Sequence, residues 1–277
     1  MPELPEVETI RRDLNELVVG RKIVSVQVVL DKPLRGYPAG RFLERLTGRT
    51  VTGVGRRAKI LVLELDSGDK VLVHLKMSGR LLYVSDDVPV AKHTHLIFGL
   101  DNGRELRFVD MRKFGYIKLV EGGRLEDVDE LKRLGPEPLA DDFSAADFAR
   151  LIGSKAASRR PLKAFLIDQS FLAGIGNLYA DEILHAAKIL PGRSMSSLSR
   201  ADTDRVYRAM RRILADAIEA RGTSFDLYVD AHGEQGGYVK KLQVYGRAKE
   251  PCFACGAPLL KVRLAGRGTS YCAGCQR

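Results

Sequence analysis

Two groups of residues, one at each end of the 277-residue chain, carry functional groups suited to a reaction or to metal binding. At the start, Pro2 and Glu3 follow Met1, and a methionine before proline is a common substrate for removal of the first residue. Once exposed, the secondary amine of Pro2 could attack an electrophilic sugar carbon and form an iminium ion, as lysine amines do in Schiff bases. Glu3 beside it is a candidate general acid or base. The alternative is that Pro2 and Pro5 only begin a helix.

The second group consists of the four cysteines, which all lie in the last 26 residues. They form two C-x2-C pairs with sixteen residues between the pairs. This spacing predicts one tetrahedral Zn²⁺ site, which is structural because four protein ligands leave no open position for a substrate. Redox pairs or unliganded thiols are the alternative. The predicted ligands are Cys252, Cys255, Cys272 and Cys275.

The N-terminal group must be positioned by the segment that follows it. Apolar residues recur every three or four positions from Leu4 to Gly20, which predicts a helix with one apolar face. Pro5 suits the first turn and Gly20 suits the end. Pro2 would then lie just before the positive end of a helix dipole, which lowers the pKa of its amine and favours the neutral nucleophile.

Composition narrows the class of protein. The chain is 45% hydrophobic and 29% charged, which is typical of a globular protein. It has no apolar run of membrane-spanning length and no signal-peptide pattern, so we expect a cytoplasmic location without a membrane partner. The net charge of +10 favours DNA or RNA over an acidic membrane as partner, with simple solubility charge as the alternative.

The order of the predicted elements indicates an α+β fold. After the first helix, short alternating or apolar runs separated by turns, such as Asp101-Asn102-Gly103, predict a β-sandwich or barrel. Capping patterns at Ser144 and Ser199 then indicate helices, with a helix–two-turn–helix around Gly174-Ile175-Gly176. The predicted domains are a catalytic β-sandwich with its leading helix (1–134), a linker (135–142), a helical DNA-binding domain (143–237) and a zinc ribbon (238–277). The ribbon carries six cations and one acid from Arg247 onward, as a rigid DNA-binding hairpin would.

Several motifs together resemble formamidopyrimidine-DNA glycosylase, Fpg. The resemblance covers essentially the whole chain and includes the four-cysteine ribbon. The motifs that carry it are Pro2-Glu3-Leu4-Pro5-Glu6-Val7-Glu8-Thr9, Arg57-Ala58-Lys59, His74-Leu75-Lys76-Met77-Ser78-Gly79, Asp110-Met111-Arg112-Lys113-Phe114-Gly115, Gly174-Ile175-Gly176-Asn177-Leu178-Tyr179-Ala180 and Gln243-Val244-Tyr245-Gly246-Arg247.

This resemblance implies a bifunctional base-excision enzyme. It would remove oxidised purines, such as 8-oxoguanine and formamidopyrimidines, from double-stranded DNA and then cut the abasic strand by β- and δ-elimination. Pro2 would attack C1′ of the damaged nucleotide, and Glu3 would transfer a proton on the sugar ring. Glu6 would support the same pocket, and Lys59 would hold a phosphate or assist a proton transfer.

The resemblance also implies the DNA contacts. The damaged nucleotide must be flipped out of the duplex, and wedged side chains offset the cost of unstacking. Gly222–Lys240 would form a mobile loop that closes over the flipped base, although its glycines also suit a plain connector. Residues matching the family's DNA contacts are Met77, Arg112 and Phe114 in the void, His93, Lys163 near the lesion pocket, and Asn177 and Arg267 at phosphates.

Two rival functions stay open. An endonuclease VIII-like member of the same superfamily would act on oxidised pyrimidines. A non-catalytic zinc-ribbon protein would also be basic and carry clustered cysteines, but it would have no need of a free secondary amine beside Glu3.

Overall fold

A computed structural model describes residues 1–153, 160–225 and 227–277. The chain divides into two compact units. Unit 1 contains Met1–Lys132 together with Ala220–Val239, and unit 2 contains Arg133–Glu219 together with Lys240–Arg277. None of the described helices combines the length and the apolar character that crossing a lipid bilayer requires.

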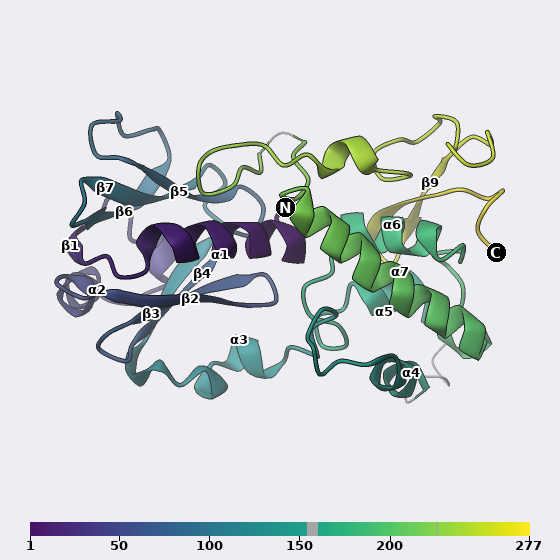
Figure 1. Cartoon of the computed structure of the whole chain (residues 1–277), viewed down its shortest axis with the longest axis horizontal. Coiled ribbons are helices and arrows are strands. Elements are labelled where there is room, and N and C mark those ends of the chain that lie inside the picture. Colours follow the sequence, from purple (N-terminus) through teal and green to yellow (C-terminus); the bar gives the residue numbers. More distant parts are fainter. Residues whose placement is uncertain (154–159, 226) are drawn as a thin grey trace. The chain divides into compact units, whose positions relative to one another are not determined.

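Unit 1 is a sandwich of two four-stranded antiparallel sheets, as predicted. One sheet has the order β1-β6-β7-β5 and the other β2-β3-β4-β8. Helix α1 runs along the side of the sandwich and packs mainly against β2 (Figure 1). The elements are α1 (Leu4–Val18), β1 (Ile23–Val28), α2 (Ala39–Leu46), β2 (Val51–Arg57), β3 (Ile60–Leu65), β4 (Lys70–His74), β5 (Gly79–Ser85), β6 (Thr94–Leu100), β7 (Arg104–Asp110), β8 (Tyr116–Val120) and α3 (Asp129–Lys132), with short 3-10 turns at Lys32–Leu34, Glu121–Gly123 and Leu125–Asp127.

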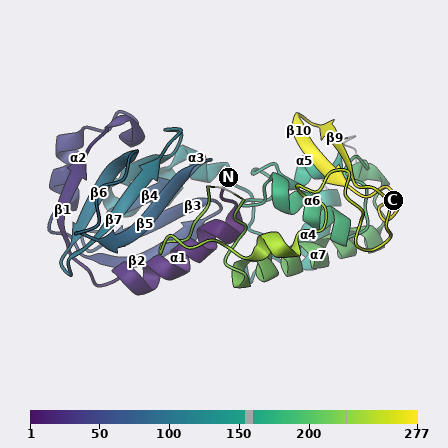
Figure 2. The ribbon, with the colours of Figure 1, turned by 90° about the horizontal axis from the view of Figure 1, so that it is seen from above.

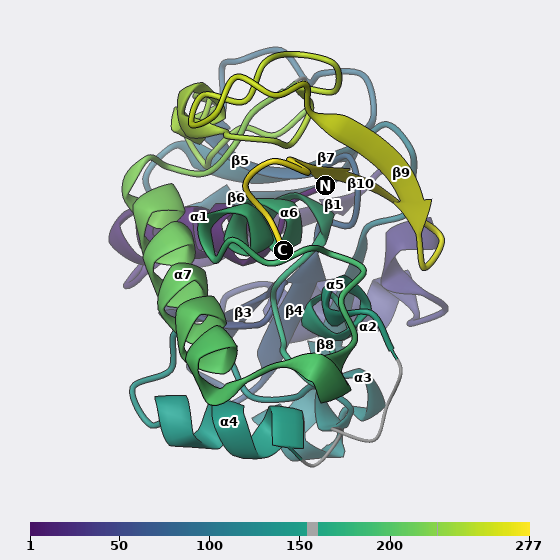
Figure 3. The same cartoon turned by 90° about the vertical axis from the view of Figure 1, so that its right-hand side faces the viewer.

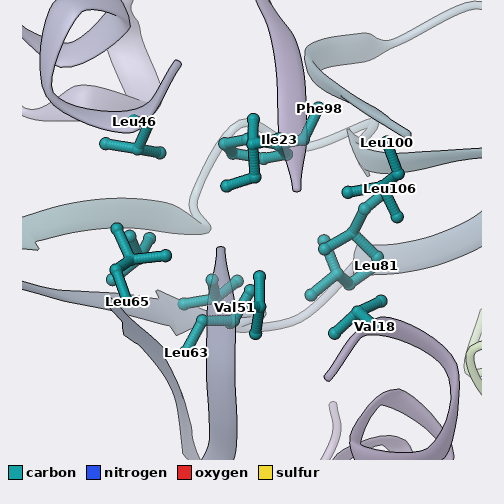
Figure 4. Close-up of a pocket in the computed structure, with 12 residues that line it drawn as sticks. Val18, Ile23, Leu46, Val51, Leu63, Leu65, Leu81, Phe98, Leu100 and Leu106 are labelled. Carbon is teal, nitrogen blue, oxygen red and sulfur yellow. The ribbon is translucent and has the colours of Figure 1, made fainter. Parts of the chain in front are cut away.

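The core of unit 1 lies between the two sheets and is closed by helices. Figure 4 shows side chains from both sheets converging with Val18 of α1 and Leu46 of α2. The cavity among them measures only about 10 Å³ and its lining is entirely apolar. A space of this size and polarity fits no ligand, so this part of the sandwich serves as a scaffold.

Most strands of unit 1 follow the alternating and apolar runs in the sequence, but strands β2 and β5 and helices α2 and α3 were not predicted from it. The predicted hairpin across Asp101-Asn102-Gly103 is present as β6 and β7. Strand β2 was missed because Gly53 and Gly55 lower its strand propensity, and pairing with β3 stabilises it instead.

Unit 2 combines helices with a two-stranded hairpin. Helix α7 packs against α4 and α6 (Figure 3), and α6 packs against the hairpin (Figure 2). Both predicted capping boxes are confirmed, since the backbone N–H groups of Asp147 and Asp202 donate to Ser144 and Ser199. The elements are α4 (Ala145–Gly153), α5 (Leu162–Leu166), α6 (Asn177–Ala186), α7 (Arg200–Glu219), β9 (Leu260–Leu264) and β10 (Arg267–Tyr271), with 3-10 turns at Met195–Ser197 and Tyr238–Lys241.

The compact units divide the chain differently from the predicted domains. The first boundary, between residues 132 and 133, lies near the predicted one at 134. Residues 220–239, however, join unit 1, although the prediction assigned residues up to 237 to the helical domain. The reason is that this segment bonds to α1 and β5: the Arg221 guanidinium lies 2.7 Å from the Asp13 carboxylate, and the Tyr83 N–H donates to Ala231 O at 2.8 Å. The ribbon clusters with the helices of unit 2 instead of standing alone.

Candidate functional site

The start of α1 holds buried carboxylates beside Pro2. Pro2 lies just before the helix, as predicted, and its side chain is buried. Glu3 is 4% exposed and Glu6 is 2% exposed. The Glu3 backbone N–H donates to Glu6 Oε2 at 2.7 Å, and the Thr223 N–H donates to Glu6 Oε1 at 2.8 Å. Glu6 therefore joins the backbone beside Pro2 to the segment 220–239.

Lys59 lies at the tip of the hairpin between β2 and β3, where Ala58 has a left-handed φ of 52°. The Arg56 guanidinium donates both to Glu8 Oε2 of α1 at 2.9 Å and to Ala58 O at 2.9 Å. Although burial raises the pKa of Glu8, hydrogen bonds from Arg11 and Arg56 hold it below its usual value. Arg56, which the sequence did not single out, thereby fixes the turn that carries Lys59 to α1.

Three turns of unit 1 bring four predicted DNA contacts to one end of the β1-β6-β7-β5 sheet. Met77 precedes β5, His93 precedes β6, and Arg112 and Phe114 follow β7. Met77 is 40% exposed and Phe114 is 50% exposed, so both apolar side chains are accessible to a binding partner. The Arg112 guanidinium lies 4.8 Å from the centre of the Phe114 ring. Met77, Arg112 and Phe114, which are predicted to fill the void, are thus all exposed on neighbouring turns. Side chains that insert into a base stack need such exposure.

His74 stays neutral beside this cluster. It is the last residue of β4, and its Nδ1 accepts the Lys76 N–H at 3.1 Å. Burial, together with the charges of Lys76, Lys59 and Arg35, lowers the pKa of His74 to about 3. The half-buried His74 ring thus belongs to the edge of the core.

Lys163 lies buried inside unit 2. Its side chain is 1% exposed, and its Nζ lies 2.7 Å from Asp181 Oδ1 and donates to Thr269 Oγ1 at 2.8 Å. The ammonium therefore joins α5 to α6 and β10 inside unit 2. The sequence resemblance gave no information that the fold encloses this side chain, and the contact of Lys163 with DNA stays a prediction.

Asn177 and Arg267 both lie close to Gly268 of β10. Asn177 begins α6, as predicted, and its Nδ2 donates to Gly268 O at 3.0 Å. Lys163 Nζ donates to the same carbonyl at 2.9 Å. Arg267 is exposed at the start of β10, next to that shared carbonyl. Both predicted phosphate contacts are thereby brought to one end of the hairpin.

The four cysteines gather as the Zn²⁺ prediction requires. Their Sγ atoms all lie within 4.8 Å of one another, with 3.8 Å between Cys252 and Cys275 and 3.4 Å between Cys255 and Cys272. Tetrahedral Zn²⁺ with bonds of about 2.3 Å separates its sulfurs by about 3.8 Å. The donor set and the spacing therefore fit one structural zinc ion.

Two buried residues of α6 near the ribbon were missed from the sequence. His185 Nε2 lies 3.8 Å from Cys252 Sγ, and burial lowers the pKa of His185 to about 4. The Glu182 carboxylate accepts the N–H groups of three successive residues, Gln243, Val244 and Tyr245, at 2.8 to 2.9 Å. The only sequence signal for this arrangement was the Gln243–Arg247 motif, which had no assigned partner.

The segment predicted as a mobile loop, 222–240, is packed closely at its base. A Cβ at Gly222, where φ is +81°, would lie 3.0 Å from Glu6 and from Tyr228, and one at Gly236 would lie 2.3 Å from Gly222 O. Phe225 is 48% exposed, and Asp226 falls outside the described residues. Gly222 is thus required by close packing on Glu6 of α1, and Gly236 by close packing on the backbone of Arg221 and Gly222.

Three parts of the sequence match known domain families. Residues 1–117 match the formamidopyrimidine-DNA glycosylase N-terminal domain, and residues 134–228 match the corresponding H2TH domain. Residues 249–277 match a zinc finger found in FPG and IleRS. The formamidopyrimidine-DNA glycosylase of Pelotomaculum thermopropionicum is 43% identical, with 100% of this chain and 99% of that protein covered. That of Listeria monocytogenes is 42% identical, with both chains fully covered.

Solved structures of similar chains agree with the sequence matches. A variant of Lactococcus lactis Fpg in complex with DNA containing Fapy-dG has a TM-score of 0.92 and 34% identity, with 100% of both chains covered. The complex of Lactococcus lactis Fpg with DNA containing an abasic site has a TM-score of 0.92 and 34% identity, with 99% of both chains covered. These matches over the full length, together with the four clustered cysteines, show that the chain belongs to the formamidopyrimidine-DNA glycosylase family.

Proposed function

We propose that this chain removes oxidised purines, including 8-oxoguanine and formamidopyrimidines, from double-stranded DNA and then cleaves the abasic strand through Pro2. The observation that carries the proposal is the place of Pro2 at the start of α1, beside the buried carboxylates of Glu3 and Glu6. The relatives solved with DNA that contains Fapy-dG or an abasic site support this class of substrate.

The first step is displacement of the base. After removal of Met1, the neutral Pro2 nitrogen attacks C1′, and the electrons of the glycosidic bond leave with the damaged base. The positive end of the α1 dipole disfavours the protonated amine, which keeps the nucleophile available near pH 7. Glu3 transfers a proton on the sugar ring as the ring opens and the iminium ion forms. Glu6 holds the Glu3 backbone through the 2.7 Å hydrogen bond.

The second step is cleavage of the strand. The iminium ion withdraws electrons and acidifies the C2′ proton, so that loss of this proton breaks the bond from C3′ to its phosphate oxygen. In a second elimination, loss of the C4′ proton breaks the bond from C5′ to its phosphate oxygen, and water then hydrolyses the iminium ion and releases Pro2. Lys59, on the turn that Arg56 ties to α1, holds an adjacent phosphate or assists one of these proton transfers.

The exposed residues supply the contacts with DNA. Met77 and Phe114 fill the space that the flipped nucleotide leaves, and Arg112 donates to the orphaned partner base. His93, Asn177 and Arg267 contact the DNA backbone, in line with the excess of cations in the ribbon. The four cysteines hold the zinc ion, which supplies no chemistry beyond fixing the ribbon. We further propose that the protein acts as a monomer in the cytoplasm on nucleoid DNA.

A comparison of substrates tests the proposal. Wild-type protein is incubated with duplexes that contain 8-oxoguanine opposite cytosine, thymine glycol, or an abasic site, with and without borohydride. We expect excision of 8-oxoguanine, both elimination products, and a borohydride-trapped adduct on abasic DNA. Faster excision of thymine glycol would favour the endonuclease VIII-like activity. Binding without any trapped adduct would instead indicate a non-catalytic protein.

A further inference from the structure

A buried carboxylate lies where the three DNA-contacting turns of unit 1 meet. Asp110 is the last residue of β7 and is 0% exposed. It pairs with Gly79 in the β5–β7 ladder, which places it next to the turn that carries Met77. The next four residues contain Arg112 and Phe114. None of the roles proposed above uses this side chain.

Asp110 bonds to all three turns. Its Oδ1 accepts the Ser78 hydroxyl at 2.5 Å, and the Arg112 N–H is shared between Ser78 Oγ at 3.1 Å and Asp110 Oδ1 at 3.2 Å. Its Oδ2 accepts the Gly115 N–H at 2.7 Å. Its backbone N–H donates to His93 O at 3.0 Å, and its carbonyl bonds to the buried His95 ring at 2.8 Å. One residue thus fixes the backbone on both sides of Arg112 and Phe114 and the residue after Met77.

The surrounding backbone shows that these turns need such support. Lys76, His93 and Lys113, one in each turn, have left-handed φ angles of 53°, 70° and 57°. Non-glycine residues in this conformation persist only where their surroundings impose it. A Cβ at Gly115 would lie 2.8 Å from the Phe108 ring and 3.1 Å from Asp110 Oδ2. The Asp110 carboxylate and the glycine therefore fit one another closely.

We propose that Asp110 is a positioning residue for the wedge, by which we mean the side chains of Met77, Arg112 and Phe114. Before DNA binds, it holds their turns in the arrangement in which these side chains can fill the void. The inference rests on the function proposed above, because it assigns those three side chains to the void. Flipping a nucleotide costs free energy that the wedge offsets. A wedge whose turns are already ordered loses less entropy on insertion, so more of its contact energy supports the flipped state. Asp110 acts through these residues and touches neither the sugar nor the base.

Asp110→Asn is the most direct variant. It keeps the shape of the side chain but replaces one acceptor oxygen with an NH₂ donor, which must face the donors of Ser78 and Arg112 or that of Gly115. Displacement of catalytic groups by about 1 Å can cost about 10²-fold in rate. We expect excision of 8-oxoguanine from a duplex to slow by about 10- to 100-fold. Cleavage of an abasic site in single-stranded DNA, which has no void to fill, should change by less than about threefold.

A double-mutant cycle shows whether Asp110 acts through the wedge. Phe114→Ala slows duplex excision by itself, and adding Asp110→Asn to it should cause little further loss. Independent, multiplicative losses would overturn the proposal. Equal losses on the duplex and single-stranded substrates would also overturn it, as would a duplex rate like that of wild type. Asp101→Asn, in the exposed turn of the same β6–β7 hairpin, is the matched control and should behave as wild type on both substrates.

Ser78→Ala keeps the test decisive if Asp110→Asn does not fold. It removes only the hydroxyl that bridges Asp110 to the Arg112 N–H, and we expect a smaller loss confined to the duplex. No loss, or an equal loss on both substrates, would then overturn the proposal. Failure of the proposed function would look different, because wild-type protein itself would then leave both substrates uncut.

Discussion

Asp110 of unit 1 and Asp181 of unit 2 both lie fully buried beneath residues proposed to contact DNA, but their charges are balanced differently. Asp110 accepts hydrogen bonds from a hydroxyl group and from backbone N–H groups. Asp181 lies 2.7 Å from the Lys163 ammonium and also accepts the Ser270 N–H at 2.8 Å. Burial raises the pKa of Asp181 to about 6, although the charge of Lys163 opposes this shift.

The difference corresponds to what each carboxylate holds in place. The Asp110 carboxylate binds the ends of adjacent turns: its backbone donors lie within five residues of it, and the Ser78 hydroxyl comes from the turn before β5. The pair of Lys163 and Asp181 connects the neighbouring helices α5 and α6 with β10, which lies far from both in the sequence. We therefore expect changes at Asp110 to alter activity with little loss of stability, and changes at the ion pair to lower the stability of unit 2.

Removal of zinc should give the largest difference in stability between the two units. Structural zinc sites in small domains contribute on the order of 10 kcal/mol to folding. Cys255→Ser, or treatment with a strong chelator, should unfold the ribbon and weaken DNA binding by at least about 100-fold, while the sandwich of unit 1 stays folded. Hydrogen exchange can follow both units separately, with metal content measured in parallel. Normal binding by zinc-free protein would contradict this expectation.

Lys163→Met should have the next largest effect. It leaves Asp181 buried without its cation, which costs about 3–5 kcal/mol in comparable cases. Adding Asp181→Asn removes the charge but keeps an oxygen for the Ser270 N–H, so the double variant should regain most of the lost stability. Urea unfolding measures both variants, and Lys261→Met on the exposed part of β9 is the control. If the single and double variants were equally destabilised, the ion pair would not be what holds the hairpin.

The stability of the protein measured over a range of pH tests whether His74 is neutral in the folded state. The pKa of His74 falls from 6.5 to about 3 on folding, so the unfolded chain binds a proton between these values and the folded chain does not. Stability is therefore fully present above pH 6.5 and falls as the pH is lowered, with about 2 kcal/mol lost at pH 5. His74→Gln should lose this part of the pH dependence in urea unfolding. If the free energy of unfolding of that variant depended on pH as it does in wild type, the pH dependence would come from other groups.

The sequence predicted features that depend on local spacing and missed those that depend on long-range contacts. The cysteine pairs, the capping boxes at Ser144 and Ser199, and the β6–β7 hairpin each lie in one short stretch, so their geometry follows from nearby residues. The burial of Lys163 depends on Thr269, more than a hundred residues away. The assignment of residues 220–239 to unit 1 likewise depends on Asp13 and Glu6, which no local pattern connects to that segment.

Peptide mapping of the borohydride-trapped complex shows whether the Pro2 nitrogen forms the covalent intermediate. Wild-type protein lacking Met1 is reacted with abasic DNA in the presence of borohydride and then digested with protease and nuclease. The account predicts that mass spectrometry finds the sugar remnant on the peptide that begins with Pro2. A remnant on Lys59 or another lysine, with Pro2 unmodified, would contradict it.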